Sequence, residues 1–167
     1  NCRSLRKIQR EVKTFIEGVY VSQDKKVHYE LSEEDIDSWI LAINDELGGR
    51  KKPKKFISLR LVTYKEMCKL NLDFRGINRP TNVLAFPSQS EIKNDQNNLI
   101  GDIAICVDEL KKEAKEQQKR NKDHLAHLFI HGALHLMGFD HRNKSDRNYM
   151  EGIEIKILYQ LGIDDPY

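Results

Sequence analysis

The apolar residues of this chain recur with two periods, and the shorter period predicts four β-strands. Residues 56–63 alternate apolar and polar side chains, as in a strand that is buried on one face. Residues 99–107 are almost entirely apolar, as in a central strand that is buried on both faces. Two shorter apolar segments, 15–21 and 83–86, complete the set, and Pro87 ends the second of them.

The longer period, in which apolar residues recur every three or four positions, predicts five helices. The first begins after Ser32, which forms a capping box with Asp35 in place of the usual Glu, and it ends at Gly48. The other predicted helices cover residues 64–72, 108–120, about 123–137 and 143–161. Because the chain contains no repeat and no linker, we expect a single domain over residues 1–167.

Two basic segments carry charge outside the predicted core. In the N-terminal extension, residues 1–13, Leu5, Ile8 and Val12 have helical spacing among basic side chains. This extension could bind a phosphate backbone or an acidic membrane, although a solvent-exposed helical extension is the simpler interpretation. The second segment surrounds Pro53, and its lysines are either only hydrated or in contact with RNA phosphates: Lys51, Lys52, Lys54 and Lys55.

The composition is that of a globular protein, with 39% hydrophobic and 32% charged residues. The formal net charge is only +2, so the overall charge does not indicate a nucleic-acid-binding protein. No apolar segment reaches the roughly 18 residues of a membrane span, and no signal peptide is visible. Three cysteines without a CxxC pair argue against a disulfide partner and for a reducing compartment, so we expect a cytoplasmic protein with buried thiols at Cys68 and Cys106.

The candidate chemistry is concentrated in residues 131–141, which hold three of the six histidines. His131 and His135 are one helical turn apart, so both imidazoles can point at one ion. Gly138 can end this helix in a left-handed conformation, after which His141 can reach the same ion from the returning chain. Unrelated histidines would rarely have this spacing by chance, so we interpret the three residues as a metal site.

Three imidazole ligands with an open fourth position are typical of a catalytic zinc site rather than a closed structural one. Nickel, copper and iron accept the same donors, so the residues alone do not determine the metal. Asp102 is a carboxylate within an apolar strand, where it could either orient a ligand histidine or cap a nearby turn. His127 is better suited to a supporting or surface position, or to proton transfer, than to metal ligation.

The histidine spacing is also that of the metzincin proteases, which place a glutamate directly after the first histidine. Here that position is Gly132. Without a carboxylate to take a proton from the zinc-bound water, peptide hydrolysis would lose about 10²–10⁴-fold in rate. A glycine would instead let another chain approach the metal, which favours a bulky polymer as the substrate.

Several segments together resemble the YbeY family of bacterial metalloproteins, which act as endoribonucleases in ribosomal RNA maturation. His131 to His141 resemble the signature of the family, and residues 70–76 and 80–87 resemble its second motif. Residues 101–103 resemble a third motif, and residues 161–167 resemble the tail of proteobacterial members. The resemblance covers about residues 14–167 and leaves the basic N-terminal extension outside.

The resemblance implies an α+β fold in which a small mixed four-stranded sheet packs against about five helices, with the metal site at the end of a central helix. It implies that Arg75 is important for RNA cleavage, and a guanidinium can bind phosphate through two hydrogen bonds. Lys54 and Lys55 are further candidates for substrate binding, and Asp140 of the signature is a supporting residue. One Zn²⁺ per chain would be bound by His131, His135 and His141.

The function implied by the resemblance is that of a metal-dependent, single-strand endoribonuclease in ribosomal RNA processing, small-subunit maturation and ribosome quality control. The implied partners are ribosomal RNA and the small ribosomal subunit, with ribosomal proteins and an Era-type GTPase as further candidates. A non-catalytic ribosome assembly factor is the main alternative, and a metzincin-like zinc hydrolase is a weaker one. The chain departs from the family at Asn82 and Ala85, and also at Phe74 and Phe139, so no mechanism can depend on a tyrosine hydroxyl at the last two.

Overall fold

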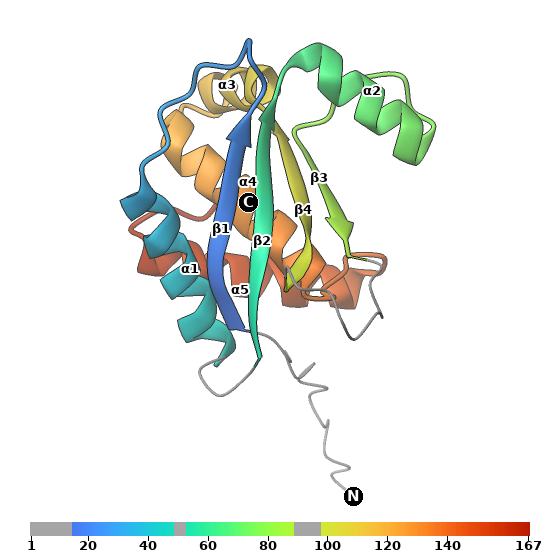
Figure 1. Cartoon of the computed structure of the whole chain (residues 1–167). Coiled ribbons are helices and arrows are strands. Elements are labelled where there is room, and N and C mark those ends of the chain that lie inside the picture. Colours follow the sequence, from blue (N-terminus) through green and yellow to red (C-terminus); the bar gives the residue numbers. More distant parts are fainter. Residues whose placement is uncertain (1–14, 49–52, 89–97) are drawn as a thin grey trace, which may run out of the picture.

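A four-stranded mixed sheet forms the centre of the molecule (Figure 1). The computed structural model describes residues 15–48, 53–88 and 98–167. The strand order is β1-β2-β4-β3, in which β1, β2 and β4 are parallel and β3 runs antiparallel to β4. All four predicted strands are confirmed, with the bounds β1 Phe15–Gln23, β2 Lys54–Val62, β3 Val83–Pro87 and β4 Leu99–Cys106.

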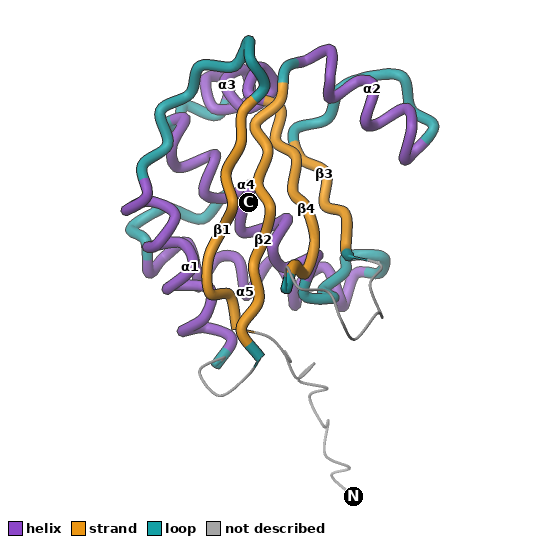
Figure 2. Tube along the Cα trace, in the orientation of Figure 1, coloured by secondary structure: helices purple, strands orange, loops and turns teal. Residues whose placement is uncertain are grey.

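Within the described residues five helices accompany the sheet, so the predicted α+β fold is also confirmed (Figure 2). Two helix ends differ from the prediction. The second helix continues past Leu72 to Arg75, and Gly76 ends it with a φ of 70°. The third helix stops at Glu116 because Gln118 adopts a φ of 55°, outside the helical range. The bounds are α1 Glu33–Leu47, α2 Tyr64–Arg75, α3 Val107–Glu116, α4 Asn121–Leu136 and α5 Lys144–Gln160.

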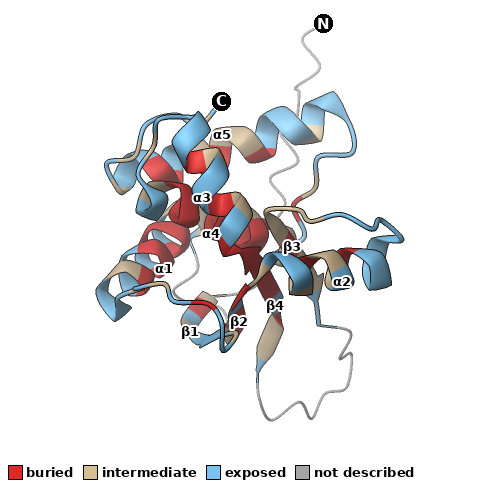
Figure 3. Cartoon of the chain, turned by 90° about the horizontal axis from the view of Figure 1, so that it is seen from above, coloured by how far each residue is buried: buried red, intermediate tan, exposed pale blue. Residues whose placement is uncertain are grey.

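The two faces of the sheet are covered unequally. Along β4, Ile103 and Ile105 belong to the main core, whereas Ala104 and Cys106 belong to a smaller cluster that includes Met67 of α2. Because successive side chains of a strand point to opposite faces, α2 covers a face opposite to that of the main core. Most of the buried residues lie between the sheet and the helices α1, α4 and α5 (Figure 3).

The helix α4 is central to this packing, because it contacts both β3 and β4 as well as α1, α3 and α5. Its buried side chains include Leu125, Phe129 and Leu134, none of which is more than 1% exposed. In Figure 1 its C-terminal end lies near the lower ends of β3 and β4. A helix held on so many sides is a rigid base for the side chains of its last two turns.

Some predictions fall outside the part of the chain that the structure describes. These are the basic extension over residues 1–13 and the lysines Lys51 and Lys52. Within the described ranges, no helix is both long and apolar enough to cross a lipid bilayer.

Candidate metal centre

The structure brings the three predicted histidines together. His131 and His135 occupy consecutive turns of α4, which ends at Leu136. Gly138 has a φ of 88° and turns the chain, so that His141 returns toward the helix end. One nitrogen from each imidazole lies within 4.8 Å of the nitrogens from the other two. The predicted turn chemistry thus produces the predicted cluster.

The outer nitrogens of the two helical histidines are held by partners. Nδ1 of His131 lies 2.6 Å from Oε1 of Glu154, and Nδ1 of His135 lies 3.1 Å from the carbonyl oxygen of Phe139. Both Nδ1 atoms therefore donate a hydrogen bond, which leaves the lone pairs of both Nε2 atoms available to a metal ion. These Nε2 atoms are 3.1 Å apart. A tetrahedral zinc ion with bonds of 2.0–2.1 Å requires about 3.3 Å between ligand nitrogens, so the donors fit such an ion.

The protonation state of His135 also suits metal binding. Burial lowers the pKa of this imidazole, and the nearby rings of His131 and His141 lower it further when they are charged. His135 is therefore neutral near pH 7, and the neutral ring is the form that binds a metal. Within the described ranges, no other His, Cys, Asp or Glu joins the three donors. A fourth coordination position would then be available to water or substrate.

Glu154 on α5 is the supporting residue that the sequence analysis missed. Its side chain is completely buried, and it accepts hydrogen bonds from His131 and from the hydroxyl of Tyr167. Burial by itself raises the pKa of this carboxyl, but hydrogen bonds from His127, His131 and Tyr167 outweigh it and lower the pKa to about 2. The ionised carboxylate orients His131 and increases the basicity of its ring. The signal in the sequence was an acidic residue at an inward position, between Ile153 and Ile157.

His127 lies beside Glu154 and Tyr167. Its Nε2 lies 3.6 Å from Oε2 of Glu154 and 3.5 Å from the hydroxyl oxygen of Tyr167. Its side chain is 15% exposed. His127 and His131 therefore face the same buried carboxylate.

Asp140 shapes the loop that presents His141. Its Oδ1 accepts a hydrogen bond of 2.7 Å from the backbone N–H of His141, and its Oδ2 lies 2.6 Å from Nε of Arg142. The backbone hydrogen bond from His141 lowers the pKa of this carboxyl, and so does the charge of Arg142. Asp140 thus supports a ligand through the backbone and not through the imidazole.

Asp102 does not lie with the histidines. It is exposed, and its place in the alternation of β4 puts it on the same face as Ala104, opposite to the face that α4 covers. The structure gives it no contact with a ligand histidine. The orienting role that was one of its two predicted alternatives is performed by Glu154 and by the carbonyl of Phe139.

Gly132 also has a different role from the one expected. It is buried, and a Cβ atom at this position would lie 3.1 Å from two side-chain carbons of Ile103. The glycine therefore lets α4 pack closely on β4, and it does not open a path to the metal. The prediction that a substrate chain approaches at Gly132 is wrong.

The basic candidates lie apart from the histidine cluster. Lys54 forms an ion pair of 3.0 Å with Glu17, and Lys55 lies 3.4 Å from Oδ1 of Asn98. Both lysines belong to β2, which is separated from the β3 edge by β4.

Arg75 is exposed at the end of α2, and its guanidinium makes no hydrogen bond or ion pair within residues 15–48, 53–88 and 98–167. The neighbouring Phe74 packs on Phe86 of β3 with ring centroids 4.5 Å apart, which places this end of α2 beside β3.

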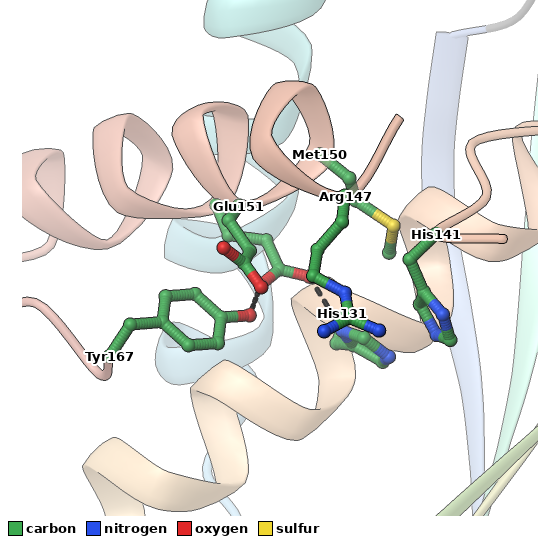
Figure 4. A pocket seen from close by; sticks show the side chains of 7 residues that line it. His131, His141, Arg147, Met150, Glu151 and Tyr167 are labelled. Atoms are coloured by element: carbon green, nitrogen blue, oxygen red, sulfur yellow. Dashed lines mark hydrogen bonds and ion pairs between the residues drawn. The ribbon is translucent and has the colours of Figure 1, made fainter. Parts of the chain in front are cut away.

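A cavity of about 220 Å³ lies beside the histidines (Figure 4). It is lined by two of the three clustered histidines and by residues of α5 and the C-terminal segment: His131, His141, Arg147, Met150, Glu151, Glu154 and Tyr167. The metal centre is thus open to a bound molecule on the side of α5.

Comparisons with known proteins match this chain to one protein family and to one solved fold. The sequence model of the family described as Endoribonuclease YbeY matches residues 20–162. A protein of that name from Alteromonas mediterranea is 46% identical over 111 residues, which are 66% of this chain and 70% of that protein. Another from Colwellia psychrerythraea is 40% identical over 136 residues, which are 81% of this chain and 87% of that protein. A solution structure from Thermotoga maritima has the same fold, with a TM-score of 0.56 and 24% identity, and the match covers 86% of this chain and 91% of that one.

Proposed function

This chain belongs to the YbeY family of endoribonucleases, and on this premise we propose that it cleaves single-stranded RNA at the histidine centre. The observation that carries the proposal is the convergence of three imidazole nitrogens within 4.8 Å of one another. Two of the three rings are oriented by hydrogen bonds from their Nδ1 atoms. A site of this kind is built to bind a metal ion and to leave a position for a reacting group.

We propose zinc as the metal, with one ion held by His131, His135 and His141. Three imidazole nitrogens within 4.8 Å of one another, two of them 3.1 Å apart, suit this ion. When bound, zinc would polarise a phosphoryl oxygen and lower the pKa of a coordinated water to about 7. The chain contributes the fixed orientation of the two helical ligands, so that little reorganisation is needed during the reaction.

Arg75 is the residue that we propose to bind the phosphate. Its guanidinium is exposed and unpaired within the described residues, so it can form two hydrogen bonds to phosphate oxygens. The end of α2 lies beside β3 through the contact of Phe74 with Phe86, and α4 contacts β3 as well. An RNA strand that crosses the β3 edge would therefore meet both Arg75 and the metal centre.

The described residues at the centre do not include a clear general base. Glu154 is fully buried, and with a pKa of about 2 it is a poor proton acceptor at neutral pH. Two routes remain, attack by a metal-activated water and attack by the ribose 2′-hydroxyl. An RNA that lacks only the 2′-hydroxyl at the cut separates them, because internal attack requires that group and water attack does not.

We propose ribosomal RNA as the substrate, in small-subunit maturation and ribosome quality control in the cytoplasm. The partners would be the small ribosomal subunit, ribosomal proteins and an Era-type GTPase. The alternative is a non-catalytic assembly factor. It is supported by the lack of a clear general base among the described residues. Cleavage by the isolated protein decides between the two.

The test compares RNA cleavage by the wild type and by His135→Ala, together with metal analysis of protein purified without an affinity tag. We expect about one zinc per chain in the wild type, and for His135→Ala a loss of metal and a fall in cleavage of more than about 100-fold. Equal residual cleavage in both preparations would reveal a contaminating nuclease and would contradict the proposal. Metal binding without any cleavage would favour the assembly factor.

A further inference from the structure

The cavity beside the histidines extends beyond the metal position toward the C-terminal segment. In Figure 4, His131 and His141 lie at one end, Glu151 and Tyr167 lie at the other, and Arg147 extends between them from α5. The volume of about 220 Å³ exceeds what a metal ion and one water need, since one water occupies about 30 Å³ in the liquid. The cavity therefore has room for part of a substrate next to the reacting bond.

Arg147 gives the middle of this cavity an anion-binding group. The residue is exposed on the first turn of α5, and its side chain extends toward the imidazoles of His131 and His141 (Figure 4). Among the residues that the structure describes, its guanidinium has no hydrogen bond or ion pair. An unpaired guanidinium beside a phosphodiester-cleaving centre is suited to bind a phosphate. Arg75 approaches β3 from α2, so Arg147 would bind a different phosphate of the same strand.

Tyr167 gives the far end of the cavity an aromatic ring held in a fixed place. Its hydroxyl donates a hydrogen bond to the buried Glu154, and its backbone N–H donates one of 2.9 Å to Asp165. The ring of His127 contacts it edge-on, with centroids 5.6 Å apart and an interplanar angle of 89°. The residue is nevertheless 59% exposed. A rigid, partly exposed ring of this kind is a platform on which a base can stack.

Side chains of opposite charge lie toward the two ends of the cavity. The positive guanidinium of Arg147 lies toward the histidines, whereas the carboxylate of Glu151 lies toward Tyr167. A phosphate is attracted to the first group and repelled by the second. The sugar and base of a nucleotide, which carry hydrogen-bond donors and an aromatic face, fit the end that holds Glu151 and Tyr167.

We propose that this cavity is a binding subsite for the nucleotide adjacent to the scissile phosphate. Arg147 binds the phosphate of that nucleotide, Tyr167 stacks on its base, and Glu151 accepts a hydrogen bond from its sugar or base. The proposal rests on the proposed ribonuclease function and adds to it a place where one base is recognised by stacking. Because every base has an aromatic face, the subsite accepts any of the four and rejects a nucleotide without a base.

The experiment measures kcat and KM at saturating zinc on a single-stranded RNA that the wild type cuts, and on versions that lack one base at a time. The variants are Arg147→Gln, Tyr167→Leu and Tyr167→Phe. The matched controls are Lys144→Gln for Arg147 and Tyr159→Leu for Tyr167, both on α5. Neither control residue lines the cavity, and Tyr159 is 82% exposed.

We expect Arg147→Gln and Tyr167→Leu each to raise KM by roughly tenfold, while both controls stay within about twofold. Tyr167→Phe keeps the aromatic ring and should raise KM less than Tyr167→Leu does. Removal of one base next to the cut raises KM for the wild type by a similar factor and has no further effect on Tyr167→Leu. If Tyr167→Phe and Tyr167→Leu behave alike, the tyrosine acts only through its hydroxyl on Glu154 and the subsite is disproved. Full cleavage by every variant also overturns the subsite but leaves the ribonuclease function intact, whereas no cleavage by the wild type overturns both.

Discussion

At the end of α4, the nitrogens of His131 and His135 that face away from the metal position are bonded to Glu154 and to the carbonyl of Phe139. At the end of α2, by contrast, Arg75 is exposed, and its guanidinium has no partner in the described parts of the chain. The two ends flank the same edge strand, β3. The comparison shows that the two proposed parts of the site are held differently. The histidines proposed as metal ligands are fixed by hydrogen bonds, whereas the side chain proposed to bind the substrate is not.

The largest effect is expected from removing the charge that supports the ligands. Glu154→Gln keeps the size of the side chain but replaces an ionised acceptor by a neutral amide. We expect the affinity for zinc to fall by about 10- to 100-fold, with a parallel fall in cleavage at limiting zinc. Competition with a chromogenic chelator measures the affinity, and Glu116→Gln, an exposed residue at the end of α3, is the control. Unchanged zinc affinity in Glu154→Gln would mean that His131 does not need a negatively charged partner.

Arg75→Ala should show the opposite pattern. Because Arg75 has no contact with the metal ligands, zinc affinity and stability should not change. The kcat/KM for RNA should fall by at least about tenfold through the loss of a charged hydrogen bond to phosphate. Lys69→Ala removes an exposed charge from the same helix and serves as the control. A folded Arg75→Ala protein that cleaves as well as the wild type would remove Arg75 from the mechanism.

A smaller effect is expected for the third ligand, whose support lies at the surface. Asp140→Ala removes the acceptor for the backbone N–H of His141 and the partner of Arg142. We expect zinc affinity to fall only about threefold, because exposed polar interactions contribute little net energy. The same chelator competition checks this value. A loss as large as that in Glu154→Gln would show that the loop, and not the helix, controls the site.

The smallest effect concerns the contact of α4 with the sheet. Gly152→Ala on α5 meets nothing within 4 Å and should stabilise the protein by about 0.5–1 kcal/mol through better helix propensity. Gly132→Ala meets Ile103 at 3.1 Å, and the crowding should cancel this gain or cost about 1 kcal/mol. Urea denaturation of both variants measures the difference. Equal stabilisation by both would show that α4 does not need a glycine to pack on β4.

The elements and the histidine trio could be predicted because both depend on local spacing. The four-residue interval between His131 and His135 fixes their common face of the helix, and the glycine after it predicts the turn. Glu154 could not be placed in the same way, since it is separated from His131 by 23 positions and meets it only through the packing of α5 on α4. Its position on an apolar stripe indicated burial but not a partner.

The errors have physical reasons of the same kind. A charge within the apolar segment 99–107 indicated a buried Asp102, but alternation along β4 places it on the face that α4 does not cover. Gly132 lies next to a ligand in the sequence, yet neighbouring residues of a helix point about 100° apart, and this one faces Ile103. Adjacency in the sequence is therefore a poor guide to which residues share the metal centre.

The position of the histidines at the C-terminal end of α4 has an electrostatic consequence. The aligned peptide dipoles of a long helix give its C-terminal end a partial negative charge, equivalent to roughly half an elementary charge. His131 and His135 lie on the last two turns of this 16-residue helix, so its field attracts a divalent cation without any further ligand. The same field repels phosphate. A polyanion can approach this end of the helix only when positive charge offsets the field, and under the proposals above Arg75 and Arg147 would supply that charge.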